Sequence, residues 1–355
     1  MTKTIQTAVV GVTGYAGAEL ARLLLRHPRL QGTPPVFAGR VDEKDAARGG
    51  VPLSEIHPQL ADSSGNGNLR LEAFSWELLA SRRVEVLFLA TPHEQSREWV
   101  PEALARGLRV IDLSAAWRLK EEANRSVYAF ENEGTELAAD TQAQAVYGLP
   151  ELHRAQIAGA RLIANPGCYA TSIILPLRPL VAAGLVDLKH GIVADAKSGA
   201  SGAGKAPSAR THFMYAADNL SAYGVFTHRH TGELLEQIGL DSSEIIFSPH
   251  LLPIPRGILA TIYVHFHKPQ TKNSITRVYE EFFAGSPMVR LYGATLPQIQ
   301  YSVRTNYADI GFQLAADGRR AVIVSCLDNL LKGASGQAVQ NLNVMLGWPE
   351  SEGLE

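Results

Sequence analysis

The sequence has few cysteines, almost no net charge and no long apolar run, and each shortage excludes a class of protein. Its 355 residues include two cysteines and carry a formal net charge of −2. A chain without a basic excess is not expected to bind nucleic acid through phosphate contacts. No stretch approaches the roughly 20 apolar residues that a membrane-spanning helix needs. We therefore expect neither a nucleic-acid partner nor a membrane.

The cysteines and the first residues predict a reducing, cytoplasmic setting. Cys168 and Cys326 lie far apart and form no CxxC pair, unlike the dense cysteine frameworks of small secreted domains. Residues 1–4 lead directly into a strand-like run, without the charged and apolar pattern of a signal peptide. The expected location is the cytoplasm.

The chain contains enough apolar material for two domains. Hydrophobic residues make up 46% of it and charged residues 19%, and this length exceeds what one compact core usually supports. In the first half, short apolar runs at 5–10, 35–38, 84–90 and 108–113 alternate with helix-compatible segments such as 96–106. This alternation predicts a parallel, doubly wound sheet.

A glycine-rich turn follows the first apolar run. Residues 11–17 read Gly-Val-Thr-Gly-Tyr-Ala-Gly, and helix-favouring residues follow at 18–25. A strand, a glycine turn and a helix in this order place a pyrophosphate against the helix N-terminus. The spacing is GxxGxxG rather than GxGxxG, and such turns also serve packing. The turn predicts dinucleotide binding, with a packing role as the alternative.

Residues that follow the later strands indicate which dinucleotide is bound. Arg40 comes directly after the second apolar run, where a site that prefers NAD usually has an acidic residue. An arginine there would accommodate a 2′-phosphate, so we predict NADP. Asp42 lies nearby, and an ordinary surface arginine is the alternative. Thr91, Pro92 and Arg118 also follow predicted strands, at the edge where ligands bind in such sheets.

A cysteine stands at a predicted helix start in the middle of the chain. Cys168 follows Pro166 and Gly167 and precedes a run of apolar, helix-compatible residues. Unpaired N–H groups and the helix dipole at such a position favour a thiolate, and they can also hold an oxyanion. The alternative is a small buried hydrophobe. We expect Pro176 and Pro179 to break this helix.

Two later segments carry polar groups suited to catalysis. The loop 197–205 combines three glycines with flanking lysines, which suits a backbone that wraps an anionic or planar ligand, with flexible filler as the alternative. The stretch His228-Arg229-His230, with Glu233 close behind, offers an acid/base, an orienting carboxylate and an anion clamp. It lacks a third metal ligand at a recognised spacing, so we predict no metal site.

Seven stretches, in order along nearly the whole chain, read GVTGYAGAEL, DLSAAWRLK, ANPGCYAT, SGASGAGK, HRHTGE, PHLLPIPRGI and DNLLKGASGQAVQNLN. Together they resemble the N-acetyl-gamma-glutamyl-phosphate reductases of the semialdehyde dehydrogenase group. The resemblance implies an α/β protein with a Rossmann NADP-binding domain and an α+β catalytic and dimerisation domain. We place the first at 1–164 plus 328–355, with a late helix returning to it, and the second at 165–327. The tail after Trp348 is expected to fray.

The same resemblance implies a reaction and an oligomer. The Cys168 thiolate attacks the acyl phosphate of N-acetylglutamyl phosphate and expels phosphate, and the resulting thioester is reduced to the semialdehyde at the expense of NADPH. We expect His228 to act as the acid/base, oriented by Glu233, and His230 to contact substrate; the reverse assignment of the histidines stays open. A homodimer or homotetramer is expected.

The remaining site residues are assigned by the same resemblance. The cofactor contacts are Gly11, Thr13, Gly14, Tyr15, Ala16, Gly17, Arg40, Thr91, Pro92, Ser198, Gly199 and Asn329. The substrate contacts are Arg118, Asn165, Lys205, Arg229 and Arg256. The alternatives are a reductase of aspartyl or aminoadipyl phosphate, a Cys–His hydrolase and a non-catalytic NADP-binding regulatory protein.

Overall fold

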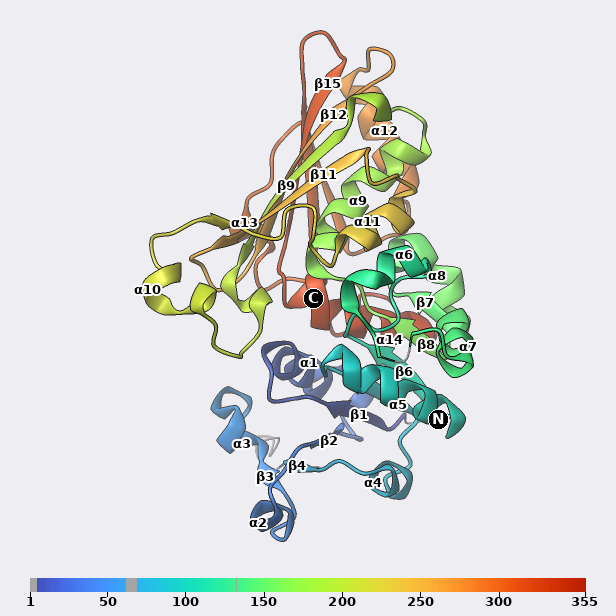
Figure 1. The fold of residues 1–355 in the computed structure, drawn as a ribbon, viewed down its shortest axis with the longest axis vertical. Coiled ribbons are helices and arrows are strands. Elements are labelled where there is room, and N and C mark those ends of the chain that lie inside the picture. Colours follow the sequence, from blue (N-terminus) through green and yellow to red (C-terminus); the bar gives the residue numbers. More distant parts are fainter. Residues whose placement is uncertain (1–4, 62–68, 132) are drawn as a thin grey trace. The chain divides into compact units, whose positions relative to one another are not determined.

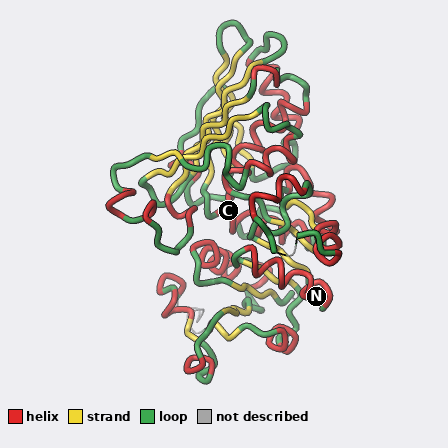
Figure 2. Tube along the Cα trace, viewed as in Figure 1, coloured by secondary structure: helices red, strands yellow, loops and turns green. Residues whose placement is uncertain are grey.

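The computed structural model describes residues 5–61, 69–131 and 133–355, so the predicted absence of a signal peptide at residues 1–4 lies outside the described residues. The contacts divide the chain into two compact units. Unit 1 comprises residues 1–118, 131–165 and 335–355, and unit 2 comprises residues 119–130 and 166–334. Figures 1 and 2 show a sheet flanked by helices within each unit.

Unit 1 is built on an eight-stranded sheet with the order β3-β4-β2-β1-β5-β6-β8-β7. All neighbouring strands are parallel except β3 and β4. The four predicted apolar runs form β1, β2, β5 and β6, so the predicted parallel, doubly wound sheet is confirmed. The strands are β1 (Thr7–Val10), β2 (Val36–Gly39), β3 (Val51–Pro52), β4 (Arg70–Ala73), β5 (Val86–Leu89), β6 (Arg109–Asp112), β7 (Ala145–Tyr147) and β8 (Leu162–Ala164).

A helix from the end of the chain completes unit 1. Every residue of α14 is buried, and the helix packs against α1 and α8. Two of its side-chain amides are anchored there, because Gln337 and Asn341 both donate to the carbonyl of Gly148. The helices of unit 1 are α1 (Tyr15–Arg26), α2 (Glu43–Ala46), α3 (Leu53–Ile56), α4 (Trp76–Ser81), α5 (His93–Ala105), α7 (Glu136–Gln144), α8 (Pro150–Gly159) and α14 (Gly336–Met345).

The polar tail after Trp348 is ordered against unit 1, so the expectation of fraying is wrong. The Nε of Arg29 donates to both carboxylate oxygens of Glu352 at 3.0 Å. The side-chain amide of Asn343 donates to the carbonyls of Glu350 and Glu352. The tail's polar groups therefore meet complementary partners that are distant in sequence, which local composition does not reveal.

Unit 2 contains a mixed seven-stranded sheet with the order β10-β11-β9-β12-β15-β14-β13. The pairs β9–β11 and β13–β14 are parallel, and the other neighbours are antiparallel. The strands are β9 (Ile192–Gly199), β10 (Ser221–Ala222), β11 (Ile245–Leu252), β12 (Ile258–His265), β13 (Val289–Gly293), β14 (Ala308–Leu314) and β15 (Arg320–Leu327). The helices are α6 (Glu122–Arg125), α9 (Cys168–Ala182), α10 (Phe213–Ala216), α11 (Thr231–Ile238), α12 (Lys272–Phe282) and α13 (Ile299–Ser302).

Helix α9 lies at the centre of unit 2 and is unbroken. It packs against β12, β15, α11 and α12, and it contains both Pro176 and Pro179, so the predicted break is wrong. An internal proline costs about 3 kcal/mol in an isolated helix. Here most of the helix is buried, and the hydroxyl of Tyr279 donates to the carbonyl of Pro176 at 2.8 Å. Burial against the sheet outweighs the local cost.

The other face of this sheet carries partly exposed apolar side chains. Val193, Ile246 and Tyr263 project from it with 37%, 43% and 45% of their surfaces exposed. They are register neighbours across β11, β9 and β12. These three side chains therefore form an apolar row across three neighbouring strands.

The predicted domain boundaries lie between residues 164 and 165 and between residues 327 and 328. The two compact units of the structure are divided at different residues. Residues 328–334 stay with unit 2, where Asn329 accepts a hydrogen bond from the amide of Gly257. Residues 119–130 also join unit 2, because Glu236 on α11 accepts the amides of Lys120 and Glu121. In both places, hydrogen bonds between residues distant in sequence join the segment to the rest of unit 2.

Candidate active site

Cys168 is the first residue of α9, as predicted. Gly167 precedes it in an extended conformation and caps the helix without a side chain. The first amides of a helix have no partner within it, so this end of α9 presents N–H groups beside a half-buried thiol. The other cysteine, Cys326, is fully buried in β15, and burial raises the pKa of its thiol to about 12. Of the two cysteines, only Cys168 therefore stands at a helix N-terminus.

A buried carboxylate joins α11 to the start of α9. Glu233 is fully buried in the first turn of α11, and its Oε2 accepts the amide of Gly167 at 2.9 Å. Its Oε1 lies 4.0 Å from Nε2 of His230. A Cβ added to Gly167 would lie 2.5 Å from that nitrogen. The imidazole of His230 therefore rests directly on the residue before Cys168.

His228 occupies a different environment from His230. Its Nδ1 accepts the backbone amide of His230 at 3.1 Å, and the rings of Tyr169, Tyr223 and Phe247 surround it at 5.2–5.5 Å. Burial, with a smaller contribution from the Arg229 charge, lowers the pKa of His228 to about 4. This imidazole is therefore neutral near pH 7 and serves as an acceptor at Nδ1.

The geometry changes the expected pairing of carboxylate and imidazole. The sequence predicted that Glu233 orients His228, whereas the imidazole within 4.0 Å of that carboxylate is His230. The reason is helical spacing. His230 precedes α11 and Glu233 lies one turn later on the same side, because residues three apart face each other on a helix. The i, i+3 spacing was visible in the sequence.

Sequence reasoning missed two tyrosines and a glycine beside Cys168. The hydroxyl of Tyr223 donates to that of Tyr169 at 3.5 Å, which donates to the carbonyl of His250 at 2.6 Å. Burial raises the pKa of both phenols. A Cβ added to Gly333 would lie 2.7 Å from the Cβ of Cys168. The position of Tyr169 directly after the cysteine was the available signal; Gly333 gave none.

Arg118 and Asn165, predicted to contact substrate, are engaged by other residues of unit 1. The Nε of Arg118 donates to the carbonyl of Asn165 at 2.7 Å, and its Nη2 donates to that of Leu113 at 2.9 Å. The side-chain oxygen of Asn165 accepts from Asn341 at 3.0 Å. Both side chains therefore hold the turns that follow β6 and β8.

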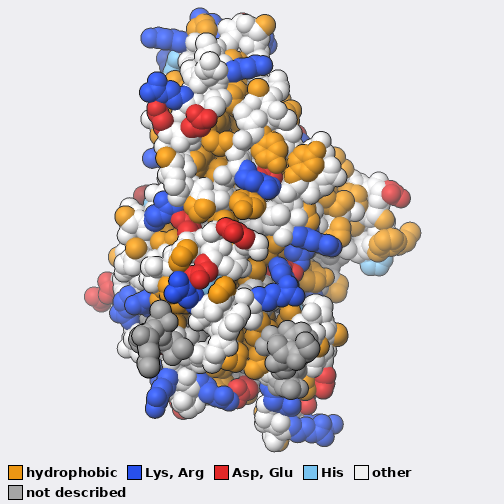
Figure 3. Space-filling model, turned by 180° about the vertical axis from the view of Figure 1, so that it is seen from behind, with side chains coloured by type: hydrophobic (Ala, Val, Ile, Leu, Met, Phe, Trp, Pro, Cys, Tyr) orange, Lys and Arg blue, Asp and Glu red, His pale blue; other side chains and the backbone are white. Residues whose placement is uncertain are grey.

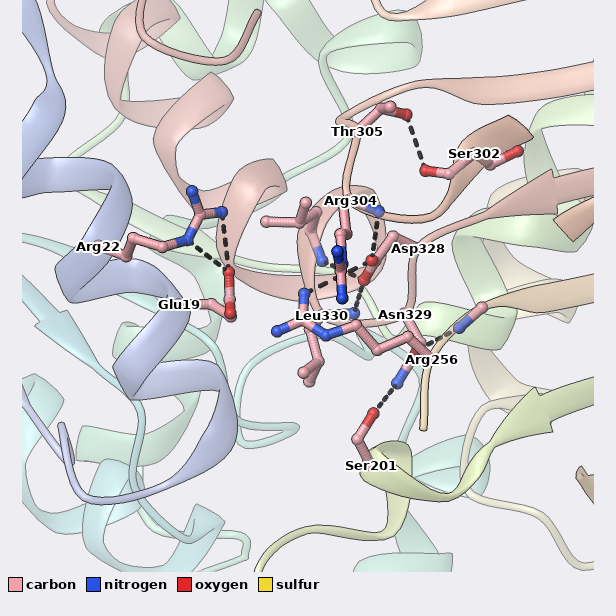
Figure 4. Close-up of polar contacts among 12 residues, drawn as sticks. Glu19, Arg22, Ser201, Arg256, Ser302, Arg304, Thr305, Asp328, Asn329 and Leu330 are labelled. Carbon is pink, nitrogen blue, oxygen red and sulfur yellow. Dashed lines mark hydrogen bonds and ion pairs between the residues drawn. The ribbon is translucent and has the colours of Figure 1, made fainter. Parts of the chain in front are cut away.

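Arg256 lies in a polar cluster of unit 2, shown in Figure 4. Its Nη1 is 3.5 Å from Oδ2 of the fully buried Asp328, which also accepts the amide of Arg304 at 2.8 Å. The neighbouring Asn329 accepts the amide of Gly257 at 2.8 Å and donates to Ser201 at 2.9 Å. The cluster thus fixes the segment that carries Arg256 against the glycine-rich loop.

The other predicted site residues of unit 2 differ in solvent exposure. Ser198 and Gly199 are buried at the end of β9, and a Cβ on Gly199 would lie 2.7 Å from the amide nitrogen of Arg256. Lys205 and Arg229 are exposed. The carbonyl of Arg229 accepts the hydroxyl of Tyr128 at 3.1 Å. Ser198, Gly199, Asn329 and Arg256 are therefore brought together.

The glycine turn of unit 1 has the geometry of a dinucleotide cradle. Gly11 has a φ of +96°, and a Cβ there would lie 2.3 Å from the carbonyl oxygen of Ala90. A Cβ on Gly17 would lie 2.2 Å from the carbonyl oxygen of Gly11. Gly14 caps α1 without a side chain, which leaves the first amides for an anion. The residues present fit a bound pyrophosphate.

The predicted cofactor residues of unit 1 share one edge of the sheet. Gly11 follows β1, Arg40 follows β2 and is exposed, and Thr91 and Pro92 follow β5. These three strands are parallel neighbours, so their carboxyl ends meet at the same edge. Tyr15 begins α1 there, with 44% of its surface exposed.

The described residues lack the features of two other kinds of site. None of the described helices combines the length and the apolar character that crossing a membrane requires. In the same part of the chain, no three His, Cys, Asp or Glu side chains are grouped closely enough to hold a metal ion.

Comparison with solved structures shows the fold. Aspartate semialdehyde dehydrogenase II from Vibrio cholerae, in complex with ASA, matches with a TM-score of 0.68 at 16% identity, over 98% of this chain and 99% of that one. A probable aspartate-semialdehyde dehydrogenase from Pseudomonas aeruginosa matches with a TM-score of 0.67 at 19% identity. The match covers 97% of this chain and 99% of that one.

Sequence comparison extends over the whole chain. An N-acetyl-gamma-glutamyl-phosphate reductase of Desulfotalea psychrophila is 42% identical, over 99% of this chain and 98% of the relative. One of Dehalococcoides mccartyi is 41% identical over the same shares. Residues 6–160 match the family model of the semialdehyde dehydrogenase NAD-binding domain, and residues 168–329 match that of the dimerisation domain. With both models matched and a thiol at the start of α9, the chain belongs to the semialdehyde dehydrogenase family.

Proposed function

We propose that this protein reduces N-acetyl-L-glutamyl 5-phosphate to N-acetyl-L-glutamate 5-semialdehyde and phosphate, with NADPH as the reductant and a covalent thioester on Cys168, in arginine biosynthesis. The full-length relatives at about 40% identity that bear the reductase name support the substrate. The observation that carries the chemistry is the junction of α9 and α11, where Cys168, His230 and Glu233 meet.

The acyl transfer follows from the position of Cys168. Its sulfur attacks the carbonyl carbon, a C–S bond forms, and the bond to the phosphate oxygen breaks, so that phosphate leaves with the bonding electrons. The positive end of the α9 helix dipole favours the thiolate before the attack and stabilises the oxyanion during it. Bound NADPH supplies the hydride that brings the thioester to the aldehyde level. The tetrahedral adduct on Cys168 then collapses, which breaks the C–S bond, releases the semialdehyde and returns the thiolate.

We assign the acid/base role to His230 rather than to His228. His230 lies against the residue before Cys168 and within 4.0 Å of the Glu233 carboxylate, so its ring is oriented beside the proposed nucleophile. His230 can then hold the proton that the departing phosphate or the tetrahedral oxygen requires. His228, neutral and enclosed by aromatic rings, fixes the backbone of His230 through its Nδ1.

The cofactor and substrate contacts are parts of the same proposal. In unit 1, the amides at the start of α1 and the close approach that Gly11 and Gly17 allow would hold the pyrophosphate, and Arg40 would contact a 2′-phosphate. In unit 2, Lys205, Arg229 and Arg256 are the candidate partners of the substrate's carboxylate and phosphate. Arg118 and Asn165 keep the turns after β6 and β8 in place.

The assembly and setting are also proposed. The match of residues 168–329 to a dimerisation domain supports a homo-oligomer, either a dimer or a tetramer. Two free thiols fit a reducing cytoplasm. The formal charge of −2 gives no reason to expect a nucleic-acid partner.

The deciding experiment measures NADPH oxidation with N-acetylglutamyl, aspartyl and aminoadipyl phosphates in parallel. We expect turnover of the first substrate and a loss of about 10⁴-fold or more in Cys168→Ser, the range seen when a nucleophile is removed. Cys326→Ser is the matched control and should retain activity.

Other outcomes of this assay identify the alternatives. Preference for another acyl phosphate would change the substrate, whereas phosphate release without NADPH oxidation would favour a hydrolase. Binding of NADPH without turnover of any substrate would favour a regulatory protein. Equal activity of Cys168→Ser would refute the thioester.

A further inference from the structure

A buried carboxylate directly after β15 joins three segments of unit 2. Charged side chains of both signs lie at the surface in Figure 3, whereas Asp328 is fully buried. Its Oδ1 accepts the amides of Leu330 and Leu331 at 2.8 and 3.1 Å. Its Oδ2 accepts the amide of Arg304 at 2.8 Å and lies 3.5 Å from Nη1 of Arg256. A buried charge is costly unless it is paired in this way, so the carboxylate and the three segments hold one another in place.

The first of these segments contacts the proposed nucleophile. The carbonyl of Asp328 accepts the amide of Gly333 at 2.9 Å, and Leu331–Ser335 form a π-helical turn. Such turns are rare and are frequently found at functional sites. A Cβ added to Gly333 would lie 2.7 Å from the Cβ of Cys168 and 3.2 Å from the carbonyl oxygen of Asp328. The turn that begins at Asp328 therefore packs directly on Cys168.

The second segment carries Arg256, a candidate partner of the substrate's anionic groups. Its partly exposed guanidinium pairs with Asp328. The next residue, Gly257, has a φ of +106° and donates its amide to the side chain of Asn329 at 2.8 Å. Asp328 and Asn329 are adjacent in sequence. Two neighbouring side chains therefore hold the guanidinium and the backbone of this segment.

The third segment is strained at the residue that Asp328 holds. Arg304 has a φ of +67°, a left-handed conformation that is unfavourable for a residue with a Cβ. Its amide donates to the Asp328 carboxylate, and Figure 4 shows this carboxylate between the segments that carry Arg256 and Arg304. Strain of this kind persists only where the surrounding structure imposes it, and it is concentrated at functional sites.

We propose that Asp328 is a positioning residue of the reaction, which sets the guanidinium of Arg256 relative to Cys168 and thereby aligns the substrate's anionic group for the attack. The side chain acts through other residues, because it is fully buried and pairs with Arg256 on one side and with the turn at Gly333 on the other. This inference rests on the proposed function, in which Arg256 binds the substrate.

The first variant is Asp328→Asn, with kcat/KM for N-acetylglutamyl phosphate as the measured quantity. The amide oxygen can still accept from Leu330 and Leu331, because asparagine forms such turns as readily as aspartate. The amide nitrogen then faces the donors of Arg304 and Arg256 and displaces the guanidinium. We expect kcat/KM to fall by about 10²-fold, the cost of misplacing a binding group by about 1 Å.

A double-mutant cycle with Arg256→Gln distinguishes positioning from general damage. Once the guanidinium is absent, Asp328→Asn has no route to the substrate, so it should cause little further loss of kcat/KM in the Arg256→Gln background. A purely structural role would give the same loss in both backgrounds. Thermal unfolding of each variant verifies that it is folded at the assay temperature.

The matched control is Asp309→Asn. Asp309 is also fully buried in unit 2 and paired with an arginine, since Arg290 donates to its two oxygens at 2.6 and 2.8 Å. This pair joins β13 to β14 and includes no residue of the proposed mechanism. Asp309→Asn should lower the free energy of unfolding, because it leaves a buried pair incomplete, but kcat/KM should match that of wild type.

A second measurement involves no turnover. In a Cys326→Ser background, the rate of Cys168 alkylation by iodoacetate is divided by the rate with neutral iodoacetamide. A guanidinium held beside the sulfur attracts the carboxylate reagent, so Asp328→Asn and Arg256→Gln should each lower this ratio by about fivefold, the size of one charge pair in water. Loss of the Asp328 charge without displacement of Arg256 would raise the ratio instead.

Two outcomes overturn the inference. One is an equal loss of kcat/KM from Asp328→Asn in the wild-type and Arg256→Gln backgrounds. The other is an alkylation ratio in Asp328→Asn that equals or exceeds that of the parent protein. If the chain oxidises no NADPH with any of the acyl phosphates but the ratio falls as expected, the reductase is refuted and the positioning of Arg256 by Asp328 stands.

Discussion

The carboxylate of Glu233 accepts the backbone amide of Gly167 at 2.9 Å, and this bond joins the first turn of α11 to the residue that precedes Cys168. A fully buried carboxylate needs such partners, because an unpaired buried charge is costly. The same side chain approaches His230. One residue therefore holds both the turn before the proposed nucleophile and the ring of the proposed acid/base.

Replacing Glu233 by Gln tests the charge separately from the shape. The amide oxygen can still accept from Gly167, but the negative charge beside His230 is lost. A neutral neighbour favours the imidazolium less, so the limb of the kcat/KM profile assigned to His230 should move to lower pH. We expect kcat to fall by about 10²-fold, within the range of general acid–base effects. The pH profile of NADPH oxidation measures both changes.

The control for this substitution is Glu236→Gln. Glu236 lies on the same helix and accepts backbone amides of residues 120 and 121, but the proposed mechanism does not use it. Its pH profile should match that of wild type. An unaltered profile in Glu233→Gln would show that the carboxylate does not influence the titrating group.

The two histidines should respond differently to substitution. His230→Asn removes the proposed acid/base, so kcat should fall by about 10²–10⁴-fold and one limb of the pH profile should disappear. His228→Asn removes a neutral acceptor whose pKa is about 4, so the rate should fall less and the limb should stay. Steady-state profiles from about pH 5 to pH 8 distinguish the variants. The opposite pattern would return the role to His228.

Local patterns in the sequence predicted the parts of the site that adjacent residues define. The start of α9 at Cys168 follows from the Pro-Gly turn, and the cradle at residues 11–17 follows from a strand, a glycine turn and a helix. In both cases the chemistry depends on backbone geometry within a few residues. Such signals need no knowledge of what packs nearby.

Contacts between distant residues could not be predicted in this way. The engagement of Arg118 by the carbonyl of Asn165, the burial that keeps α9 continuous through Pro176, and the approach of Gly333 to Cys168 all depend on tertiary packing. The pairing of Glu233 with His230 is the exception, since its i, i+3 spacing is local.

The dinucleotide cradle can be tested at one glycine. A Cβ on Gly17 would lie 2.2 Å from the carbonyl oxygen of Gly11, so Gly17→Ala must displace the backbone that approaches the pyrophosphate. NADPH binding, measured by the enhancement of its fluorescence, should weaken by at least about tenfold. Gly32→Ala is the matched control, because nothing lies within 4 Å of its added Cβ. Equal affinities would refute the proposed cradle.

Substitution of Arg40 tests whether the protein prefers NADPH to NADH. A charge-assisted hydrogen bond contributes about 1.5–3 kcal/mol, which corresponds to about 10–100-fold in affinity. Arg40→Ala should therefore raise the KM for NADPH by that factor and leave the KM for NADH nearly unchanged. Arg48→Ala, another exposed arginine of unit 1, is the control. A parallel rise in both KM values would assign Arg40 to another part of the cofactor.

The lowered pKa of the buried His27 predicts how the free energy of unfolding of unit 1 depends on pH. The ring is fully buried, stacks on Trp348 at 5.3 Å, and lies 3.0 Å from the side-chain oxygen of Asn343 through Nε2. Burial lowers its pKa below the ordinary value of 6.5, so below pH 6.5 the unfolded chain binds a proton that the folded chain excludes. The free energy of unfolding contributed by a neutral His27 is therefore present above that pH and declines as the pH falls toward the folded pKa.

Urea unfolding of wild type and His27→Gln across this pH range measures the effect. Wild type should lose stability on acidification, whereas His27→Gln should lose less, because glutamine has no proton to gain. His267→Gln, at a histidine with 54% of its side chain exposed, is the control and should follow wild type. If His27→Gln and wild type lost stability in parallel, the acid sensitivity would have to arise from other groups. The ordered tail around Trp348 would then not depend on the protonation of His27.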